Sequence, residues 1–199
     1  MEFYNFQPDA MRQLQDAKTE IRVMDVAAGH GRYVLEAIES SDIKPESILL
    51  RDYSDMNLRR GSELIAEKGL ASIARFVKGD AFDRESLASV TPRPTIAIVS
   101  GLYELFPDND MVARSLAGIG DAVPPGGVLI YTCQPWHPQL ELIARALTSH
   151  RAGAAWVMRR RTQNEMDQLV AQAGFRKVAE RVDESGIFTV SMAVREGAA

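Results

Sequence analysis

The sequence predicts an α/β fold in which a mostly parallel sheet of seven strands, with an antiparallel last strand, carries helices on both faces. Three observations predict this. Short β-rich runs alternate with segments of helical apolar spacing over residues 21–132. Glycine and proline interrupt the helical segments before the next run begins. Near the end, two further β-rich runs are joined by Asp183–Gly186, a connector too short for a crossover helix.

The parallel part of the sheet is expected from five runs and the helical segments between them. We expect strands at Ile21–Ala27, Ser47–Leu50, Ile73–Val77, Thr95–Val99 and Val128–Thr132, and helices at Tyr33–Glu39, Met56–Ala66, Glu85–Val90 and Asp110–Ala122. Gly69, the pair Pro92 and Pro94, and Pro124–Gly127 each separate a helical segment from the following strand. Regular alternation of this kind is typical of a parallel sheet that is covered on both faces.

The last third of the chain predicts one more helix and a hairpin. Thr162 and Glu165 fit a capping box that opens the helix, and Gly174 ends it. The runs Phe175–Val182 and Ile187–Val194 follow, and we expect them to pair as antiparallel neighbours.

Composition limits the classes of protein to which the chain can belong. It has 199 residues, 46% hydrophobic and 25% charged, and no change in composition marks a second domain, so we expect one domain over 1–199 with an N-terminal helical segment at 1–20. A net charge of −4 argues against a general nucleic-acid binder. Cys133 is the single cysteine and there are three histidines, so we expect neither a disulfide nor a metal site. We find no signal peptide and no run of the ~18 apolar residues that a membrane span needs, and we expect a cytoplasmic protein.

A glycine turn directly after the first predicted strand is the strongest local signal. Asp25–Gly31 follows the pattern acid-x-G-x-G-x-G, with Ala27 in the first glycine position. Glycines at such a point let the backbone approach a ligand, and the helix that follows offers free N–H groups. The dinucleotide pattern G-x-G-x-x-G would need a glycine where Val34 stands, which disfavours a nicotinamide cofactor without removing that alternative.

Several motifs in order resemble the class I S-adenosylmethionine-dependent methyltransferases, a Rossmann-like family, over about residues 21–194. Asp25–Gly31 is similar to that family's first motif, and Asp52 to the acid that ends its second strand. Gly79–Phe82 is similar to the adenine-binding turn after the third strand, and Pro125–Ile130 to the turn before the fifth. The terminal hairpin is similar to the family's antiparallel seventh strand.

Four stretches are more narrowly similar to a little-described group of bacterial methyltransferases that are often fused behind an α/β-hydrolase domain. They are Ala28–Tyr33, Leu50–Ser54, Ser100–Leu105 and Gln134–Pro138. This chain has no G-x-S-x-G elbow, so no hydrolase activity is carried over from such fusions.

The resemblance implies S-adenosylmethionine as the cofactor and assigns residues to it. Asp25 would orient the glycine turn and the methionyl ammonium group, and Asp52 would accept hydrogen bonds from the two ribose hydroxyls. Asp80 would accept from the adenine amino group. A simpler alternative for both Asp52 and Asp80 is the capping of the helix that follows. The cofactor-binding residues expected are Asp25, Ala27, Gly29, Gly31, Asp52, Tyr53, Asp80, Ala81, Phe82, Ser100 and Gly101.

Residues after the fourth and fifth strands would face the methyl acceptor. Tyr103 and Glu104 follow strand four, and either Tyr103 or His137 could take a proton from the acceptor. Trp136 would offer an apolar surface, although a rigid loop that packs its tryptophan under a helix is as plain an interpretation. The family pattern Asn/Asp-Pro-Pro-Tyr of enzymes that methylate planar amines is missing here.

An arginine-rich stretch over residues 139–161 is the last candidate site. It holds Arg159 and four other arginines against one acid. Arg159 would bind an anionic group of the acceptor, and the alternative is a solvated face. The resemblance also implies that Phe3, Tyr4 and Phe6 fold over the cofactor as a lid, with terminal packing as the alternative.

The function expected is methyl transfer from S-adenosylmethionine to a small-molecule or lipid-like acceptor, on oxygen or nitrogen, by in-line displacement. The donor carries its own activation, so the protein mainly aligns the acceptor and removes water. A protein of another class would show the same turn: a non-catalytic S-adenosylmethionine-binding module that acts through a protein partner.

Overall fold

The computed structural model describes residues 3–16, 18–148, 156 and 158–197, with the backbone alone for 3–8. The strands are β1 (Arg22–Val26), β2 (Ser47–Asp52), β3 (Ala74–Lys78), β4 (Ile96–Val99), β5 (Val128–Cys133), β6 (Phe175–Val182) and β7 (Thr189–Arg195). The helices are α1 (Phe3–Asp16), α2 (Arg32–Glu39), α3 (Asp55–Glu67), α4 (Arg84–Ala88), α5 (Asn109–Ala122), α6 (Leu140–Ala146) and α7 (Gln163–Gln172), with a 3₁₀ turn, η1 (Tyr103–Leu105).

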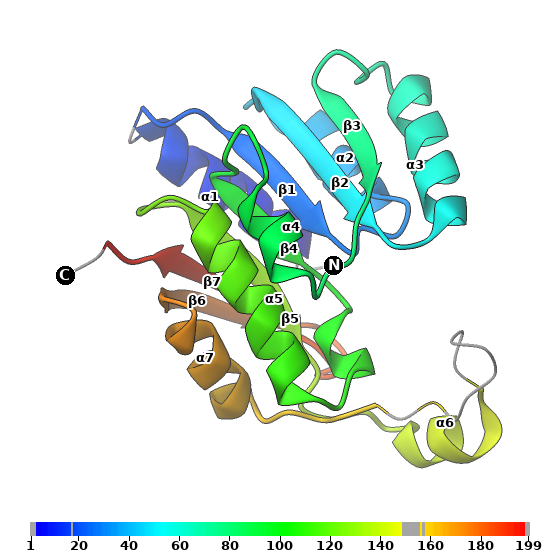
Figure 1. Ribbon diagram of the computed structural model, residues 1–199. Helices are drawn as coiled ribbons and strands as arrows, with labels where there is room; N and C mark the ends of the chain where they lie inside the picture. The colour runs from blue at the N-terminus through cyan, green and yellow to red at the C-terminus, as the bar shows by residue number, and fades with distance from the viewer. Residues whose placement is uncertain (1–2, 17, 149–155, 157, 198–199) are drawn as a thin grey trace.

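The strands form one sheet in the order β3-β2-β1-β4-β5-β7-β6 (Figure 1). The first five strands are parallel, and β7 is antiparallel to both β5 and β6. The predicted fold class is therefore confirmed, and so is the antiparallel pairing of the last two runs. The strand order reverses between β1 and β4, and ligands of open α/β sheets bind in the crevice at such a point, outside the carboxyl ends of the strands.

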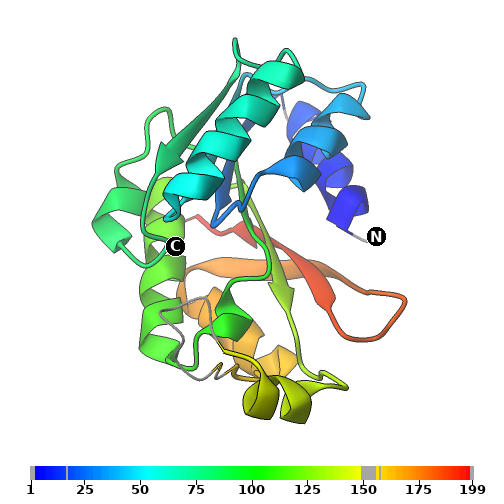
Figure 2. The ribbon, with the colours of Figure 1, turned by 90° about the vertical axis from the view of Figure 1, so that its right-hand side faces the viewer.

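Helices cover both faces of the sheet (Figures 1 and 2). On one face α1, α2 and α3 pack on alternate residues of β1, β2, β4 and β5, and Val34, Leu35 and Ile38 carry the contact of α2. On the other face α4, α5, α7 and η1 pack on the remaining strand residues. Because both faces are covered, the parallel strands read as nearly continuous apolar runs.

Local capping fixes where the helices begin. The side chains of Ser54, Asp83, Asp108 and Thr162 cap α3, α4, α5 and α7. Thr162 Oγ1 accepts the Glu165 N–H at 3.1 Å, which confirms the expected cap of the last helix. Each cap satisfies one of the free N–H groups at a helix start, and such caps stabilise by about 1 kcal/mol.

Helices α1 and α6 differ in how much of each is buried. In α1 the side chains of Ala10, Met11 and Leu14 enter the core, so its second half is part of the domain; the proposed lid aromatics Phe3, Tyr4 and Phe6 lie outside the described side chains. Helix α6 buries no residue and is set apart from the sheet in Figure 1. Within the described ranges, every helix is too short or too polar to traverse a lipid bilayer.

Candidate cofactor and acceptor site

The turn between β1 and α2 has a backbone that leaves room for a ligand. Ala27, Gly29 and Gly31 all have left-handed backbones, with φ of 61°, 59° and 70°. A Cβ placed on Gly31 would lie 2.3 Å from Leu50 Cδ1 inside the core, whereas one on Gly29 would meet no atom within 4 Å. Gly31 is therefore required by packing, and Gly29 borders open space.

Asp25 is a fully buried acid next to this turn. The Tyr33 hydroxyl donates to Asp25 Oδ1 at 2.7 Å, and Oδ2 has no hydrogen-bond partner among the described residues. Burial raises the pKa of Asp25 to about 8, the Tyr33 hydrogen bond lowers it, and the nearby Asp52 raises it further. The glycine turn was expected to be oriented by Asp25, but the structure ties its carboxylate to α2 instead.

Asp52, at the end of β2, already accepts three hydrogen bonds from the protein. Gly29 N–H donates to Oδ2 at 2.9 Å, and Ser54 N–H and Asn57 Nδ2 donate to Oδ1 at 2.9 and 3.0 Å. A carboxylate offers about four lone-pair sites. Three of these sites are used by the protein, so Asp52 has about one acceptor site left for the two ribose hydroxyls that the resemblance assigned to it, while the turn is in this position. Ser54, not Asp52, supplies the cap of α3.

The turn after β3 brings Asp80, Ala81 and Phe82 to the same edge of the sheet. Asp80 is exposed, and its Oδ1 accepts the Phe82 N–H at 2.9 Å. The cap of α4 is Asp83, so the alternative role of Asp80 as that cap is wrong. The Phe82 ring lies 4.5 Å from the Phe106 ring, between centroids, and is thus partly engaged within the protein.

Tyr53, in contrast to Phe82, is mostly exposed to solvent. Its side chain is 73% exposed at the end of β2, with Lys78 Nζ 5.8 Å from the ring centroid. An aromatic side chain with so much free surface beside the glycine turn is open to stacking with a planar ligand.

The ends of β4 and β5 are tied together at Gly101. Gly101 has φ 66°, its Cβ position is open, and its N–H donates to Thr132 Oγ1 at 2.8 Å. Ser100 and Gly101 thus lie at the carboxyl end of β4, across the switch point from the glycine turn. Thr132 was missed in the sequence; a polar residue that ends the apolar run of β5 is the signal that could have found it.

Tyr103 does not have the surroundings that its predicted role requires. The side chain is 2% exposed within the core, and its hydroxyl is 2.9 Å from Ser115 Oγ of α5. Burial raises its pKa well above the ordinary value, which opposes any proton transfer from a bound acceptor. We therefore correct the assignment of Tyr103 as a base: it packs η1 on α5.

Glu104 is also buried, at 5% exposure, and neither of its carboxylate oxygens has a hydrogen-bond partner in the described part of the chain. Burial raises the pKa of Glu104 to about 7, against lowering by its own backbone, Arg161 and Thr132. Tyr103 and Glu104, the two side chains that were expected to face the acceptor, are thus both buried. Of the two, only Glu104 has side-chain oxygens without a hydrogen bond to a described residue.

The arginine-rich stretch is mostly occupied by internal contacts. Arg159 binds the Glu165 carboxylate and donates to Pro107 O at 3.1 Å, with 41% of its side chain exposed. Arg161 is buried and donates to Asn109 Oδ1 at 2.8 Å, Tyr103 O at 2.6 Å and Phe106 O at 2.8 Å. Arg161 is therefore a structural residue, which the sequence pattern alone does not distinguish from its neighbours. Arg151, a further member of the stretch, lies outside the described residues.

Trp136 and His137 lie in the loop between β5 and α6. Trp136 is 50% exposed, so about half of its side chain is uncovered in the described part of the chain. His137 Nδ1 accepts the Gln139 N–H at 3.1 Å, which orients the ring at the start of α6. This bond leaves Nε2 as the ring nitrogen available to another group.

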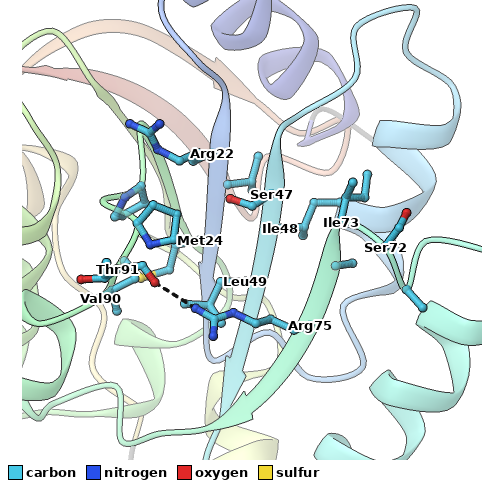
Figure 3. A pocket seen from close by; sticks show the side chains of 15 residues that line it. Arg22, Met24, Ser47, Ile48, Leu49, Ser72, Ile73, Arg75, Val90 and Thr91 are labelled. Atoms are coloured by element: carbon cyan, nitrogen blue, oxygen red, sulfur yellow. Dashed lines mark hydrogen bonds between the residues drawn. The ribbon is translucent and has the colours of Figure 1, made fainter.

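A separate cavity of about 280 Å³ opens at the other edge of the sheet, at the amino ends of β1, β2 and β3 (Figure 3). Arg22, Ser47 and Ala74 line it, together with the loop 90–94, and Arg75 donates to Thr91 O at 3.1 Å across it. Parallel α/β sheets bind their ligands at the carboxyl edge, so this cavity is distinct from the candidate site.

The seven-stranded sheet with its antiparallel β7 has the fold of the Rossmann-like methyltransferases. The crystal structure of an S-adenosylmethionine-dependent methyltransferase from Clostridium acetobutylicum ATCC 824 superposes with a TM-score of 0.70 at 10% identity, covering 98% of this chain and 92% of that one. Magnesium protoporphyrin IX methyltransferase (ChlM) from Synechocystis PCC 6803, solved with bound SAH, superposes with a TM-score of 0.68 at 13% identity, covering 98% and 84%. At such identities these likenesses show the fold.

The family follows from the sequence. Residues 4–195 match the family described as "Putative methyltransferase", and the chain belongs to that family. It is also 59% identical over 186 residues to the uncharacterised protein YnbC of Escherichia coli (strain K12), an alignment that takes 94% of this chain and 32% of YnbC. The chain thus spans about a third of the length of this relative. Family and fold confirm the predicted class, with S-adenosylmethionine as the cofactor of that class.

Proposed function

We propose that this chain is an S-adenosylmethionine-dependent methyltransferase that acts on a small-molecule or lipid-like acceptor, on oxygen or nitrogen. The observation that carries the proposal is the open turn at the switch point. Gly29 and Gly101 both border open space, one on each side of the reversal in strand order, and a buried carboxylate with a free oxygen lies beside them. The family match over residues 4–195, which includes the glycine turn and the sheet, supports the same function.

The residues at this edge fit the cofactor. The free Asp25 Oδ2 suits the ammonium group of the methionyl part, because a buried unpaired carboxylate gains most from an opposite charge. The remaining acceptor site of Asp52 suits one ribose hydroxyl. Asp80 and Ala81 suit the adenine edge, and the exposed Tyr53 ring suits its face. When bound, the cofactor supplies a methyl group that is already activated for displacement.

The chain's own residues would then align the acceptor and exclude water. Trp136 offers an exposed apolar surface at the carboxyl end of β5, and His137 presents its free nitrogen from the same loop. Arg159 keeps part of its side chain exposed, although Glu165 neutralises much of its charge. Trp136, His137 and Arg159 are therefore the acceptor contacts in this proposal, and the buried Tyr103 is not one of them.

Two measurements test the proposed function. Isothermal titration calorimetry with S-adenosylmethionine, S-adenosylhomocysteine and NAD should show binding of the first two only; tight binding of NAD alone would overturn the cofactor assignment. Incubation with methyl-labelled S-adenosylmethionine and fractionated metabolite and lipid extracts should then give a labelled product. Saturable cofactor binding with no labelled product in any fraction would point instead to a non-catalytic module that acts through a protein partner.

A further inference from the structure

Glu104 is a buried carboxylate that forms no ion pair and no hydrogen bond of standard geometry among the described residues. Its side chain is 5% exposed, and both oxygens are without a hydrogen-bond partner in the described ranges. Most buried polar atoms in proteins are hydrogen-bonded, and an unpaired buried carboxylate costs several kcal/mol. Because Glu104 destabilises the fold in this way and lies at the carboxyl edge of the sheet, it is a candidate functional residue.

Every charged or titratable group that faces Glu104 is engaged elsewhere. Arg161 donates to Asn109 and to two backbone carbonyls, and Arg159 binds Glu165. The Tyr103 hydroxyl pairs with Ser115. The Cys133 thiol donates to Arg161 O at 3.5 Å, and burial raises the pKa of that thiol to about 12. No charged side chain therefore donates a hydrogen bond to the carboxylate, and the groups that favour its charged form are its own backbone N–H, Arg161 and the Thr132 hydroxyl.

Glu104 is one of the residues that line a small cavity of about 10 Å³. Tyr103, Glu104, Thr132, Cys133, Gln134, Arg159, Arg161 and Met166 line it. A cavity of about this size holds roughly one water molecule, or one hydroxyl or amino group of a larger ligand. Larger groups would not fit without displacement of the wall.

The cavity is close to the expected place of methyl transfer. Glu104 follows Gly101 by three residues, a reach of at most ~11 Å along the chain. The Gly101 N–H donates to Thr132 Oγ1 at 2.8 Å, so a wall residue of the cavity is bonded directly to the open backbone at the end of β4.

We propose, on the basis of the proposed function, that the cavity at Glu104 receives the nucleophilic group of the methyl acceptor, and that this group is a hydroxyl or amine, with Glu104 as the base that takes its proton. A carboxylate acceptor is excluded at this position, because two carboxylates would repel each other in a buried site. The anionic group that the arginine-rich stretch suggested is therefore not the atom that becomes methylated.

The reaction balances with the groups named. The acceptor's oxygen or nitrogen forms a bond to the methyl carbon while the carbon–sulfur bond of the sulfonium donor breaks, and its electron pair stays on sulfur. The acceptor's proton passes to a Glu104 carboxylate oxygen and later to solvent. His137 would then contact the acceptor without being the base.

Unfolding of the substrate-free protein tests the buried carboxylate itself. Burial raises the pKa of Glu104 to about 7 in the folded protein. At pH values between the ordinary pKa of the side chain and 7, folding therefore takes up a proton at Glu104, and the stability of the folded state falls as pH rises through this range. The unfolding constant of wild type relative to Glu104→Gln should therefore rise at least about tenfold from pH 5 to pH 8, whereas Glu63→Gln, on the exposed face of α3, should leave the ratio constant. A ratio for Glu104→Gln that stays constant would overturn the proposal.

Product identity and kinetics test the role. The labelled product formed from fractionated extracts should be an ether or an N-methyl compound by mass spectrometry. With that acceptor, Glu104→Gln should lower kcat about 100-fold or more and lose the rise of kcat/KM with pH near 7, Glu104→Asp should keep part of the rate, and His137→Ala should keep the pH profile. Binding of S-adenosylhomocysteine should be unchanged in all three variants, which shows that they fold.

The outcomes separate this proposal from the proposed function. A methyl ester as the product, or a Glu104→Gln enzyme with the wild-type pH profile, overturns the role of Glu104 and leaves methyl transfer intact. No labelled product in any fraction overturns the proposed function, and this proposal with it.

Discussion

Asp25 is an acid whose ionisation is opposed by its position. It lies in the middle strand of the parallel sheet, beside Leu50 on β2 and Ile98 on β4, where water cannot solvate a charge. Tyr33 offsets part of that cost with one hydrogen bond, and Asp52 adds to it. A cationic ligand group would relieve the remainder, which links the stability of this chain to its cofactor.

Asp25→Asn should therefore stabilise the protein at high pH and weaken cofactor binding. The folded-state pKa is raised to about 8, above the unfolded value, so the wild type loses stability as pH rises from about 4 to 8. The amide variant escapes this loss, which amounts to at most about 5 kcal/mol at pH 8 and vanishes near pH 4. Urea unfolding at pH 4, 6 and 8 measures it, with the exposed Asp42→Asn as control. A variant less stable than wild type at pH 8 would contradict this account.

Asp52 serves both the protein and the proposed ligand. Asp52→Ala removes three hydrogen bonds that hold the glycine turn and the start of α3, and the remaining acceptor site. We expect the affinity for S-adenosylhomocysteine to fall by about 1–3 kcal/mol, together with a lower melting temperature. Asp55→Ala removes an exposed acid three residues away, which pairs with Lys78, and calorimetry should find its affinity unchanged. Equal losses in the two variants would remove Asp52 from the cofactor site.

In the glycine turn, Gly29 and Gly31 have different roles although both have a left-handed backbone. Gly31→Ala adds a Cβ 2.3 Å from the buried Leu50 at a left-handed φ, and should cost about 2–4 kcal/mol of stability. Gly29→Ala adds backbone strain alone, about 1 kcal/mol, because its Cβ meets no atom within 4 Å.

The substitutions Gly29→Ala and Gly31→Ala also distinguish an effect on folding from an effect on cofactor binding. Since the open space at Gly29 is where a ligand would approach, Gly29→Ala should weaken S-adenosylhomocysteine binding more than its small loss of stability suggests. Thermal unfolding with and without the ligand measures both effects. The assignment of this turn to the cofactor fails if Gly29→Ala binds as tightly as wild type.

Arg161 joins three elements through one guanidinium group. It connects the segment before α7 to η1 and to the first residue of α5. Arg161→Met should destabilise the protein by about 3 kcal/mol, because Tyr103 O and Phe106 O lose a charged donor in a buried position. Arg160→Met, at the exposed neighbouring position, should stay within about 0.5 kcal/mol of wild type in chemical unfolding. Similar effects of the two substitutions would show that the contacts of Arg161 carry little of the stability.

At the scale of the whole molecule, the sequence predicted the sheet because its periods are local properties. The runs at Phe175–Val182 and Ser47–Leu50 correspond to β6 and to the first residues of β2, and the hairpin follows from the length of its connector. The glycine turn was predictable for the same reason, since the positive φ of Gly29 and Gly31 is a property of the residue type.

Side-chain partners were less predictable, because they depend on segments far apart in the chain. Tyr103 follows strand four, yet the 3₁₀ turn directs it to Ser115 in the core. Arg161 and Asn109 are 52 residues apart, and no local pattern shows that they bind each other. Asn57 could have been suspected from its position at the start of a helix five residues after Asp52, but its bond to that acid requires the turn between them.

The insertion of β7 between β5 and β6 has a consequence for how the chain is made. During synthesis β6 emerges before β7, and in the described sheet β6 is an edge strand whose one neighbour is β7. Until Thr189–Arg195 have left the ribosome, the edge of β5 stays open and β6 has nothing to pair with. Nascent chains halted before residue 189 should therefore need chaperone protection, although every residue of the glycine turn has long been translated.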